Sequence, residues 1–276
     1  MRDERERERR EEGGEGRGRR TLILAAVLAA LIGLAAAGLY LWRSYDTRAG
    51  GTSEYGESVN TGEEPAVTVR GGVGRVIVEG REGLEAVEIT ARRHARGPDE
   101  AAAEQRAAGI PIDIEREGDT LYIESGGGRN TAVDYELAVP AGSSVTVETG
   151  SGAVEVRGVL GDVTAGTGAG DVTVAGSRGS VTVETSAGDA TVENVTTETG
   201  RLSLRADAGS VELRDLTLGT LDVRVGAGDV ELAGRIRGSG EIRIERGNVI
   251  VGVPEEDTAS LSFEVWLGEV MREGEE

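Results

Sequence analysis

Three aspartates follow glycines in similar short motifs, and carboxylates repeated at a regular interval could bind calcium. Asp171 and Asp229 lie in Gly-Ala-Gly-Asp-Val, and Asp189 lies in Ser-Ala-Gly-Asp-Ala. Calcium-binding β-roll repeats use a different pattern, Gly-Gly-x-Gly-x-Asp, and the equivalent position in other repeats of this chain holds no carboxylate. We therefore expect these aspartates to accept hydrogen bonds from nearby backbone, and we predict no metal site. A calcium-dependent repeat is the alternative.

Catalytic chemistry has few candidate residues. The chain has no cysteine, and its one histidine, His94, lies among arginines, so a His-dependent triad or a His/Cys metal site cannot be assembled. We expect His94 to be an exposed residue in a loop or at a strand end. Glu155, Glu212 and Glu231 should share one outward strand face, where paired carboxylates could act on a carbohydrate. We interpret them as solvated charges and predict no catalytic and no cofactor-binding residues.

The charge of the chain restricts its partners. All 30 basic residues are arginines, and they stand against 50 acidic residues, for a formal charge of −20. Residues 1–20 carry eight arginines and seven acids, a net of +1, so residues 21–276 carry −21. A surface this acidic repels phosphate backbones, which argues against a nucleic-acid partner.

A repeat organises the C-terminal half of the chain. Each unit has two apolar residues at alternate positions, then a glycine turn, then a second alternating pair, and the units recur after 18 to 21 residues. The turns are Gly152-Ala153-Val154, Gly170-Asp171-Val172, Gly188-Asp189-Ala190, Gly209-Ser210-Val211, Gly228-Asp229-Val230 and Gly247-Asn248-Val249. One unit alone buries too little apolar surface to offset the entropy of ordering it. Stacking the units as coils of a β-solenoid aligns the valines and leucines in continuous rows.

The outward positions predict further rows. Val183 should lie inside the stack, and Thr146, Thr164, Thr182 and Ser203 should form a hydroxyl row outside it. Two charge pairs are also expected between coils. One joins Glu184 to Arg205, and the other joins Arg224 to Glu245.

The N-terminal segment predicts a membrane anchor. Residues 1–20 form a charged arm, and residues 21–42 contain an uncharged run, Leu22 to Trp42, long enough to cross a bilayer as a helix. Arginines concentrate before this run, so we expect a signal anchor with the N-terminus in the cytoplasm and the main domain outside the cell membrane. A cleaved signal after Ala37 is the alternative.

The remaining segments complete the domain prediction. Residues 43–64 are polar and rich in glycine, which predicts a flexible linker. Residues 65–267 predict the all-β solenoid domain, with one short helix near residues 98–108 between Pro98 and Gly109. Residues 65–140 and the apolar segment 261–267 are expected to cap the two ends of the stack, and residues 268–276 form an acidic tail.

The strand Tyr135 to Gly142, Tyr-Glu-Leu-Ala-Val-Pro-Ala-Gly, leads into successive Val-x-Val and Gly-Asp-Val units. This order resembles the bacterial "putative adhesin" family, a domain of unknown function with a toast-rack-like β-solenoid. The resemblance covers roughly residues 65–267. It implies a non-enzymatic cell-envelope protein, with some relatives associated with envelope stress, and it carries no catalytic residues. We therefore expect a binding, adhesion or scaffolding surface for an envelope protein, peptide or polysaccharide, with a carbohydrate-active or calcium-dependent solenoid as the alternative.

Overall fold

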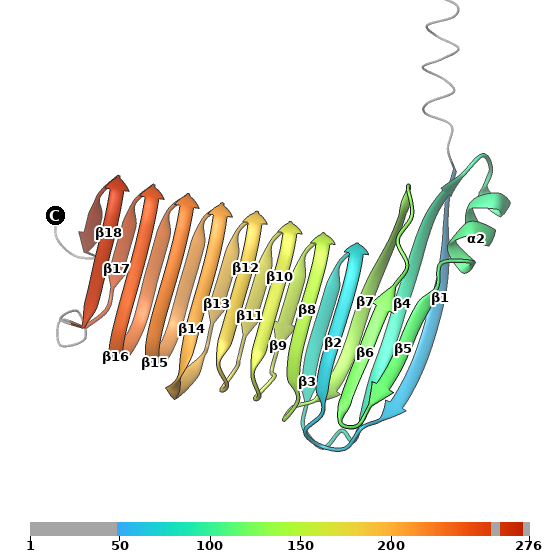
Figure 1. The fold of residues 1–276 in the computed structure, drawn as a ribbon, viewed down its shortest axis with the longest axis horizontal. Coiled ribbons are helices and arrows are strands. Elements are labelled where there is room, and N and C mark those ends of the chain that lie inside the picture. The colour runs from blue at the N-terminus through green and yellow to red at the C-terminus, as the bar shows by residue number, and fades with distance from the viewer. Residues whose placement is uncertain (1–48, 255–259, 273–276) are drawn as a thin grey trace, which may run out of the picture. The chain divides into compact units, whose positions relative to one another are not determined.

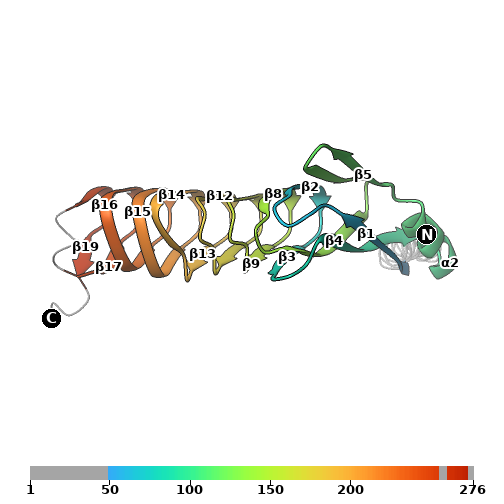
Figure 2. The same ribbon diagram turned by 90° about the horizontal axis from the view of Figure 1, so that it is seen from below.

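The computed structural model describes residues 49–254 and 260–272, apart from the side chain of Glu198. These residues form an all-β solenoid with one short helix, as predicted. Short strands stack side by side in two layers, and the chain crosses from one layer to the other at each bend (Figures 1 and 2). We call the layer that contains β8, β10 and β12 the front sheet, and the layer that contains β9, β11 and β13 the back sheet.

The elements follow one another in this order: β1 Ala49–Asn60, β2 Ala66–Val73, β3 Val76–Arg81, β4 Ala86–Gly97, α2 Glu100–Ala108, β5 Ile112–Glu117, β6 Thr120–Ser125, β7 Thr131–Pro140, β8 Ser144–Ser151, β9 Val154–Arg157, β10 Val163–Ala169, β11 Val172–Ala175, β12 Val181–Ala187, β13 Ala190–Glu193, β14 Thr196–Ala208, β15 Val211–Ala227, β16 Val230–Arg246, β17 Val249–Gly252, β18 Leu261–Leu267 and β19 Val270–Arg272.

Parallel pairing places the repeats in register. Val183 lies opposite Ala165 on one side and Leu204 on the other, and its side chain is fully buried, as predicted. The hydroxyl row is also confirmed, because Thr182 lies opposite Thr164 and Ser203. The first half of β15 and of β16 belongs to the back sheet and the second half to the front sheet. The buried valines, leucines and isoleucines form one continuous core between the layers.

A row of glycines makes the bend between the two sheets. Gly209 has a φ of 140°, and a Cβ atom on it would lie 2.0 Å from the carbonyl oxygen of Gly188 on the preceding coil. Glycine is therefore required at this position, because any other residue would be strained at this φ and its Cβ would clash with the preceding coil. Gly170 and Gly228 repeat the same arrangement.

The N-terminal part of the domain adds a coil that the repeat did not predict. Strands β2 and β3 pair in parallel with β8 and β9 on one side and with β6 and β7 on the other. Residues 65–140 were expected only to cap the stack, yet residues 66–81 form a coil within it, with β6 and β7 stacked on its outer side. The other strands of this region do cover its end, since β4 pairs antiparallel with β7 and β5 pairs antiparallel with β6.

The predicted short helix is α2, and it packs beside β4 at this end. Asp99 caps its N-terminus by accepting a hydrogen bond from the backbone N–H of Ala102 at 2.8 Å, and Gly109 ends it. Ala103 and Ala107 are buried on its inner face. A Cβ atom on Gly51 of β1 would lie 2.2 Å from the backbone nitrogen of Glu104, so the helix backbone rests directly on β1.

The flexible linker predicted for residues 43–64 is wrong for residues 49–60, which form β1. This strand pairs with β4, and Tyr55 packs against the core. The guanidinium carbon of Arg93 lies 5.8 Å from the centre of the Tyr55 ring. The sequence did not indicate β1, because the inward positions of this strand carry small or polar residues such as Gly51 and Ser53 rather than large apolar ones.

The C-terminal end differs from the cap that was expected. Strand β18 continues the front sheet beside β16, and β19 continues the back sheet beside β17, so residues 261–272 form a further coil that extends into the predicted acidic tail. Within the described residues no strand pairs with their outer edges. Four large apolar side chains of this coil are exposed, among them Trp266 on the outer face of β18: Trp266, Leu267, Val270 and Met271.

Among residues 49–254 and 260–272, no helix combines the length and the apolar character needed to cross a membrane. The charged arm predicted for residues 1–20 and the membrane span predicted for residues 21–42 lie outside the described residues.

Candidate functional site

The aspartates of the glycine turns hold neighbouring coils together. Asp171 Oδ1 accepts a hydrogen bond from the backbone N–H of Asp189 at 2.9 Å, and Asp189 Oδ1 accepts one from Ser210 at 2.8 Å. Asp229 makes the same bond with Asn248 at 2.7 Å. The predicted role as backbone hydrogen-bond acceptors is therefore confirmed. No group of three potential metal ligands gathers anywhere in the part of the chain that the structure describes.

The prediction of an exposed residue in a loop or at a strand end is wrong for His94. It lies within β4, its side chain is 36% exposed, and its Nε2 atom is 2.9 Å from Oδ2 of Asp134. The other oxygen of Asp134 accepts a hydrogen bond from the backbone N–H of Arg75 at 2.8 Å. Because β4 runs antiparallel to β7, the histidine comes to lie beside a carboxylate that is distant in the sequence.

The three glutamates considered for carbohydrate chemistry do share a row on the back sheet. Glu212 lies opposite Glu231, and Arg214 is close to both carboxylates. Glu155 is separated from Glu212 by two intervening coils, and it forms its own ion pair with Arg157 at 2.8 Å. Each glutamate is thus paired with an arginine at the surface, which is the arrangement of a solvated face and not of an acid–base pair.

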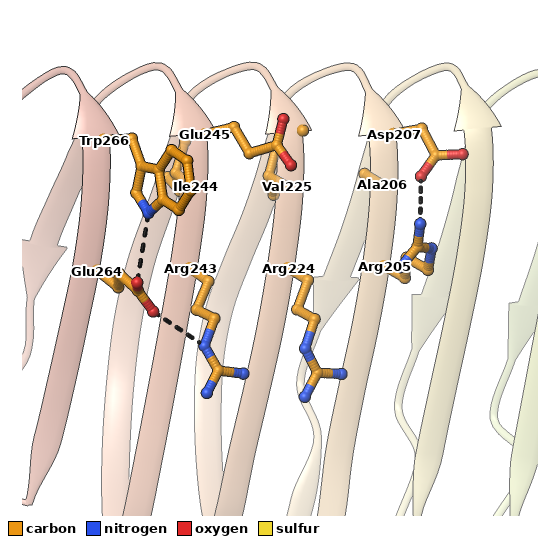
Figure 3. Close-up of a pocket in the computed structure, with 11 residues that line it drawn as sticks. Arg205, Ala206, Asp207, Arg224, Val225, Arg243, Ile244, Glu245, Glu264 and Trp266 are labelled. Atoms are coloured by element: carbon orange, nitrogen blue, oxygen red, sulfur yellow. Dashed lines mark hydrogen bonds and ion pairs between the residues drawn. The ribbon is translucent and has the colours of Figure 1, made fainter.

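The front sheet carries a row of arginines that the sequence analysis did not predict. Arg205 lies opposite Arg224, and Arg224 lies opposite Arg243, on three successive coils. Figure 3 shows Arg224 and Arg243 side by side with their guanidinium groups pointing the same way. We call these three residues the arginine ladder. The expected pair of Arg224 with Glu245 is wrong by two positions along the strand, whereas Glu184 does lie opposite Arg205.

Each arginine of the ladder has a carboxylate neighbour. Arg205 Nη2 lies 3.0 Å from Asp207, and Arg224 Nη2 lies 2.9 Å from Asp222. Arg243 Nε donates to Glu264 at 3.2 Å. Arg243 Nη2 also lies 2.5 Å from Oε1 of Glu241. A guanidinium carries five N–H groups, so each arginine keeps N–H groups beyond those in these pairs.

Two hollows flank the ladder. One, of about 220 Å³, is lined by the ladder, Asp207, Glu245 and Trp266. The other, of about 480 Å³, borders Arg201, Asp222, Glu241 and a series of hydroxyl side chains on the same sheet. These hydroxyl groups belong to Thr220, Ser239, Ser260 and Ser262. We call the outer surface formed by the ladder and these two hollows the arginine face.

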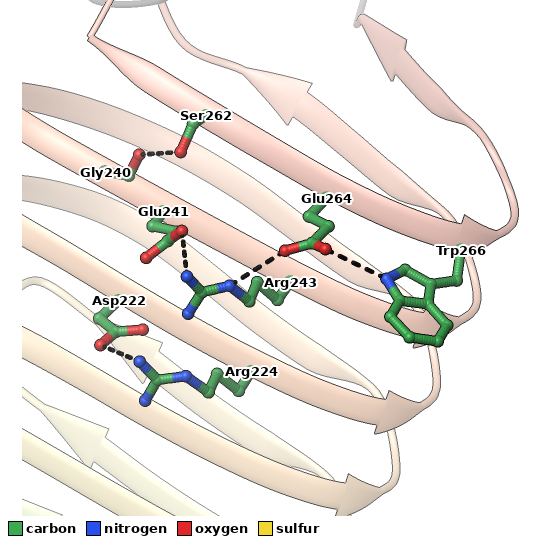
Figure 4. A network of polar contacts seen from close by, with 8 residues as sticks. All are labelled: Asp222, Arg224, Gly240, Glu241, Arg243, Ser262, Glu264 and Trp266. Atoms are coloured by element: carbon green, nitrogen blue, oxygen red, sulfur yellow. Dashed lines mark hydrogen bonds and ion pairs between the residues drawn. The ribbon is translucent and has the colours of Figure 1, made fainter.

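Trp266 stands at the end of the arginine face, on the last coil. Its side chain is 74% exposed, and its indole N–H donates to Oε1 of Glu264 at 3.3 Å. Figure 4 shows Glu264 between Arg243 and Trp266, so that one carboxylate orients both groups. The flat surface of the indole remains open to a ligand.

The spacing of the arginines could have revealed this face. Arg205, Arg224 and Arg243 recur at the same interval of 19 residues as the glycines of the last three turns. A side chain that recurs with the turn must occupy the same position on each coil. The hollows themselves depend on side-chain directions, which the spacing does not give.

Several solved structures resemble the chain at low sequence identity, whereas no curated protein matches it. They include a "putative cell adhesion protein" from Clostridium sporogenes ATCC 15579 and a "putative adhesin" each from Parabacteroides distasonis ATCC 8503 and Bacteroides fragilis NCTC 9343. Their identities are 12%, 12% and 11%, with TM-scores of 0.39, 0.45 and 0.38. Each match covers 80% of this chain and 98%, 97% and 97% of the respective structure.

The family model described as Toastrack DUF4097 matches residues 77–272, which include every coil from β8 to β19 and the whole arginine face. This match extends over more than half of the sequence. The chain therefore belongs to the Toastrack DUF4097 family.

Proposed function

We propose that this protein is a single-pass, membrane-anchored protein of the cell envelope whose β-solenoid is a non-catalytic surface for adhesion or scaffolding. The arginine face is the observation that supports a binding role. It combines hollows, paired charges and an exposed tryptophan on a rigid sheet, where side chains are held by the register of the coils. The uncharged run at residues 22–42 supports the anchor, and the family resemblance supports a link to envelope stress.

The arrangement favours binding over catalysis. A glycosidase needs two carboxyl groups in unlike environments, one of them kept protonated by burial or by a neighbouring charge. On the arginine face Asp207, Asp222 and Glu264 are each in an ion pair with an arginine, and no two of these carboxylates are set opposite each other as an acid–base pair. A partner would therefore meet fixed hydrogen-bonding groups.

Membrane topology can be tested with intact cells that carry an N-terminal tag on the full-length chain. After the outer barriers of the envelope are opened, added protease should digest the solenoid and spare the tag, because the tag lies in the cytoplasm. Disrupted cells serve as the control, in which both parts should be digested. A solenoid that survives in intact cells would overturn the proposed topology.

The binding role can be tested with the full-length chain in detergent, incubated with envelope extract and recovered by its tag. Arg224→Glu should reduce the material recovered, because it reverses the central charge of the arginine ladder. The matched control is Arg157→Glu, which removes a similar ion pair from the back sheet. Equal recovery by the two variants and the unmodified protein would show that the arginine face binds nothing in the envelope.

A further inference from the structure

We propose that the arginine face binds a neutral, unbranched oligosaccharide that lies along the stack, across the coils of the arginine ladder and against Trp266. This proposal rests on the binding function proposed above and assigns it a ligand class. It follows from four features: the paired groups of the face, the sign of its charge, the position of the tryptophan and the spacing of the coils.

The paired groups suit hydroxyls. Arg205 with Asp207, Arg224 with Asp222, and Arg243 with Glu264 each place N–H donors directly beside carboxylate acceptors. A sugar hydroxyl both donates and accepts a hydrogen bond, and two adjacent hydroxyls can bridge such a pair. Asp222 also lines the second hollow, which places its carboxylate near the hydroxyl side chains there.

The charge of the face argues against charged polymers. The three arginines of the ladder and Arg201 stand among five carboxylates, those of Asp207, Asp222, Glu241, Glu245 and Glu264, for a local balance of −1. Residues 21–276 as a whole carry −21, so a polyanion would be repelled. A polycation would have to displace the ladder arginines, because Asp207, Asp222, Glu241 and Glu264 are already in ion pairs with them. A neutral ligand encounters neither penalty.

Trp266 gives the face an apolar platform next to polar groups. Carbon-bound hydrogens on one side of a sugar ring can pack against an aromatic surface while the hydroxyls at the ring edge reach polar neighbours. The bond from the indole N–H to Glu264 fixes the orientation of the ring, and Glu264 also holds Arg243. One sugar on Trp266 would therefore have the last arginine of the ladder within reach of its hydroxyls.

The periodicity of the face suits a chain of sugars. Neighbouring coils are separated by the strand spacing of about 4.8 Å, so the ladder and the coil of Trp266 span roughly 14 Å. A pyranose unit joined through equatorial bonds advances by about one such interval. An extended peptide presents equivalent side chains every second residue, about 6.8 Å apart, and falls out of step with the coils.

The test measures binding to the full-length protein in a zwitterionic detergent, since glycoside detergents would compete. The probes are immobilised hexamers of β-1,4-linked glucose, β-1,4-linked N-acetylglucosamine, β-1,3-linked glucose and β-1,4-linked mannose, with a hexamer of galacturonic acid as the anionic comparison. We expect at least one neutral hexamer to bind at millimolar or lower concentration with little dependence on salt, because no ion pair forms.

Variants assign the binding to the face. Trp266→Ala should weaken the affinity by about tenfold, and Trp266→Phe should retain most of it, because the aromatic platform remains. Arg224→Ala should also weaken binding, whereas Arg157→Ala on the back sheet should not. Circular dichroism and thermal melting check that each variant is folded, and Trp266 is suited to this test because its side chain is exposed.

Three results would overturn the proposal: no neutral hexamer binding at millimolar concentration, binding confined to the galacturonic acid hexamer with a steep loss in salt, or equal affinity in the Trp266→Ala and Arg157→Ala variants. The proposed binding function can survive each of them. If Arg224→Glu reduces recovery of envelope material while no neutral hexamer binds, the face is a binding surface for another class of partner. If Arg224→Glu has no effect on recovery either, the binding function fails as well.

Discussion

Val183 and Thr182 are adjacent residues of β12 whose side chains point to opposite sides of the front sheet. Val183 is fully buried and Thr182 is partly exposed. Val183→Asp should unfold several coils or the whole domain, because the change loses about 1.5 to 3 kcal/mol of burial and places an unpaired charge in the core. Thr182→Asp should cost on the order of 0.5 kcal/mol. Chemical denaturation compares the two, and equal stability would contradict the assigned register.

Gly209 tests the bend between the sheets. Gly209→Ala should destabilise the domain by about 1 to 3 kcal/mol or more, because alanine is strained at a φ of 140° and its Cβ would meet the Gly188 carbonyl oxygen. Gly72 is the matched control, since a Cβ atom there has no neighbour within 4 Å. Gly72→Ala should be neutral or slightly stabilising. Denaturation midpoints that fall equally in both variants would show that the bend tolerates a side chain.

The neighbours of individual side chains could be predicted from the sequence only where the same residue type recurs on each coil. Val183 and the hydroxyl row follow from the alternation of apolar and polar residues along each strand, and the structure confirms them. The partner of Arg224 did not follow, because a charged residue can face several others and only the register selects one. The partner of His94 depends on the antiparallel pairing of β4 with β7, which no repeat indicates.

The turn aspartates act between elements, and they give a prediction about metal ions. Asp229 Oδ1 accepts a hydrogen bond from the backbone N–H of Asn248 on the next coil. This contact needs only a hydrogen-bond acceptor and does not need a bound metal ion. Chelator should therefore change the melting temperature by less than about 2 °C, whereas loss of a bound structural ion would change it by more. Asp229→Asn should melt close to the unmodified protein, and Asp229→Ala should be less stable by about 1 kcal/mol. A melting temperature that chelator lowers and calcium restores would contradict this.

Tyr135 in strand β7 should make the stability of the domain depend on pH at high pH. Burial raises the pKa of Tyr135 above its ordinary value, although the nearby Ser125 side chain acts in the opposite direction. Folding therefore favours the protonated phenol, and this contribution is complete below about pH 10 and is lost as the pH rises through the higher pKa of the folded state. Tyr135→Phe should flatten the loss of stability above about pH 10. Denaturation midpoints measured across this range for the two proteins decide the matter, and identical pH profiles would count against it.

The elements differ in how far they could be predicted. The coils from β8 to β17 and helix α2 were predicted because each carries its own local pattern, apolar alternation with a glycine turn in the coils and a capped alanine-rich segment in the helix. The position of β2 and β3 between β6–β7 and β8–β9 was not, since pairing order in space is independent of order in the chain. The arginine face could be predicted only in part. The regular spacing of its arginines is visible in the sequence, but its hollows depend on side-chain directions that the sequence does not give.

At the scale of the described domain, the two ends of the stack are unlike. At one end β4 and β5 pair with β7 and β6, and β1 and helix α2 lie beside β4, whereas at the other end β18 and β19 have unpaired outer edges within the described residues. Each internal coil is held by two neighbours and the last coil by one, so the stability of the stack is lowest at β18 and β19.

This difference has a mechanical consequence. When the stack is pulled along its axis, the load falls on the hydrogen bonds between the last coil and its neighbour, which can open one after another. The domain should therefore lengthen in steps from β19 toward β2, each releasing about 19 residues, or roughly 65 Å of chain. Single-molecule stretching between residues 49 and 272 would record these steps at low force. A single rupture of the whole domain would show that the coils resist load together. In stepwise opening the coil of Trp266 is the first to unfold, so tension would remove this end of the arginine face before the rest of the stack opens.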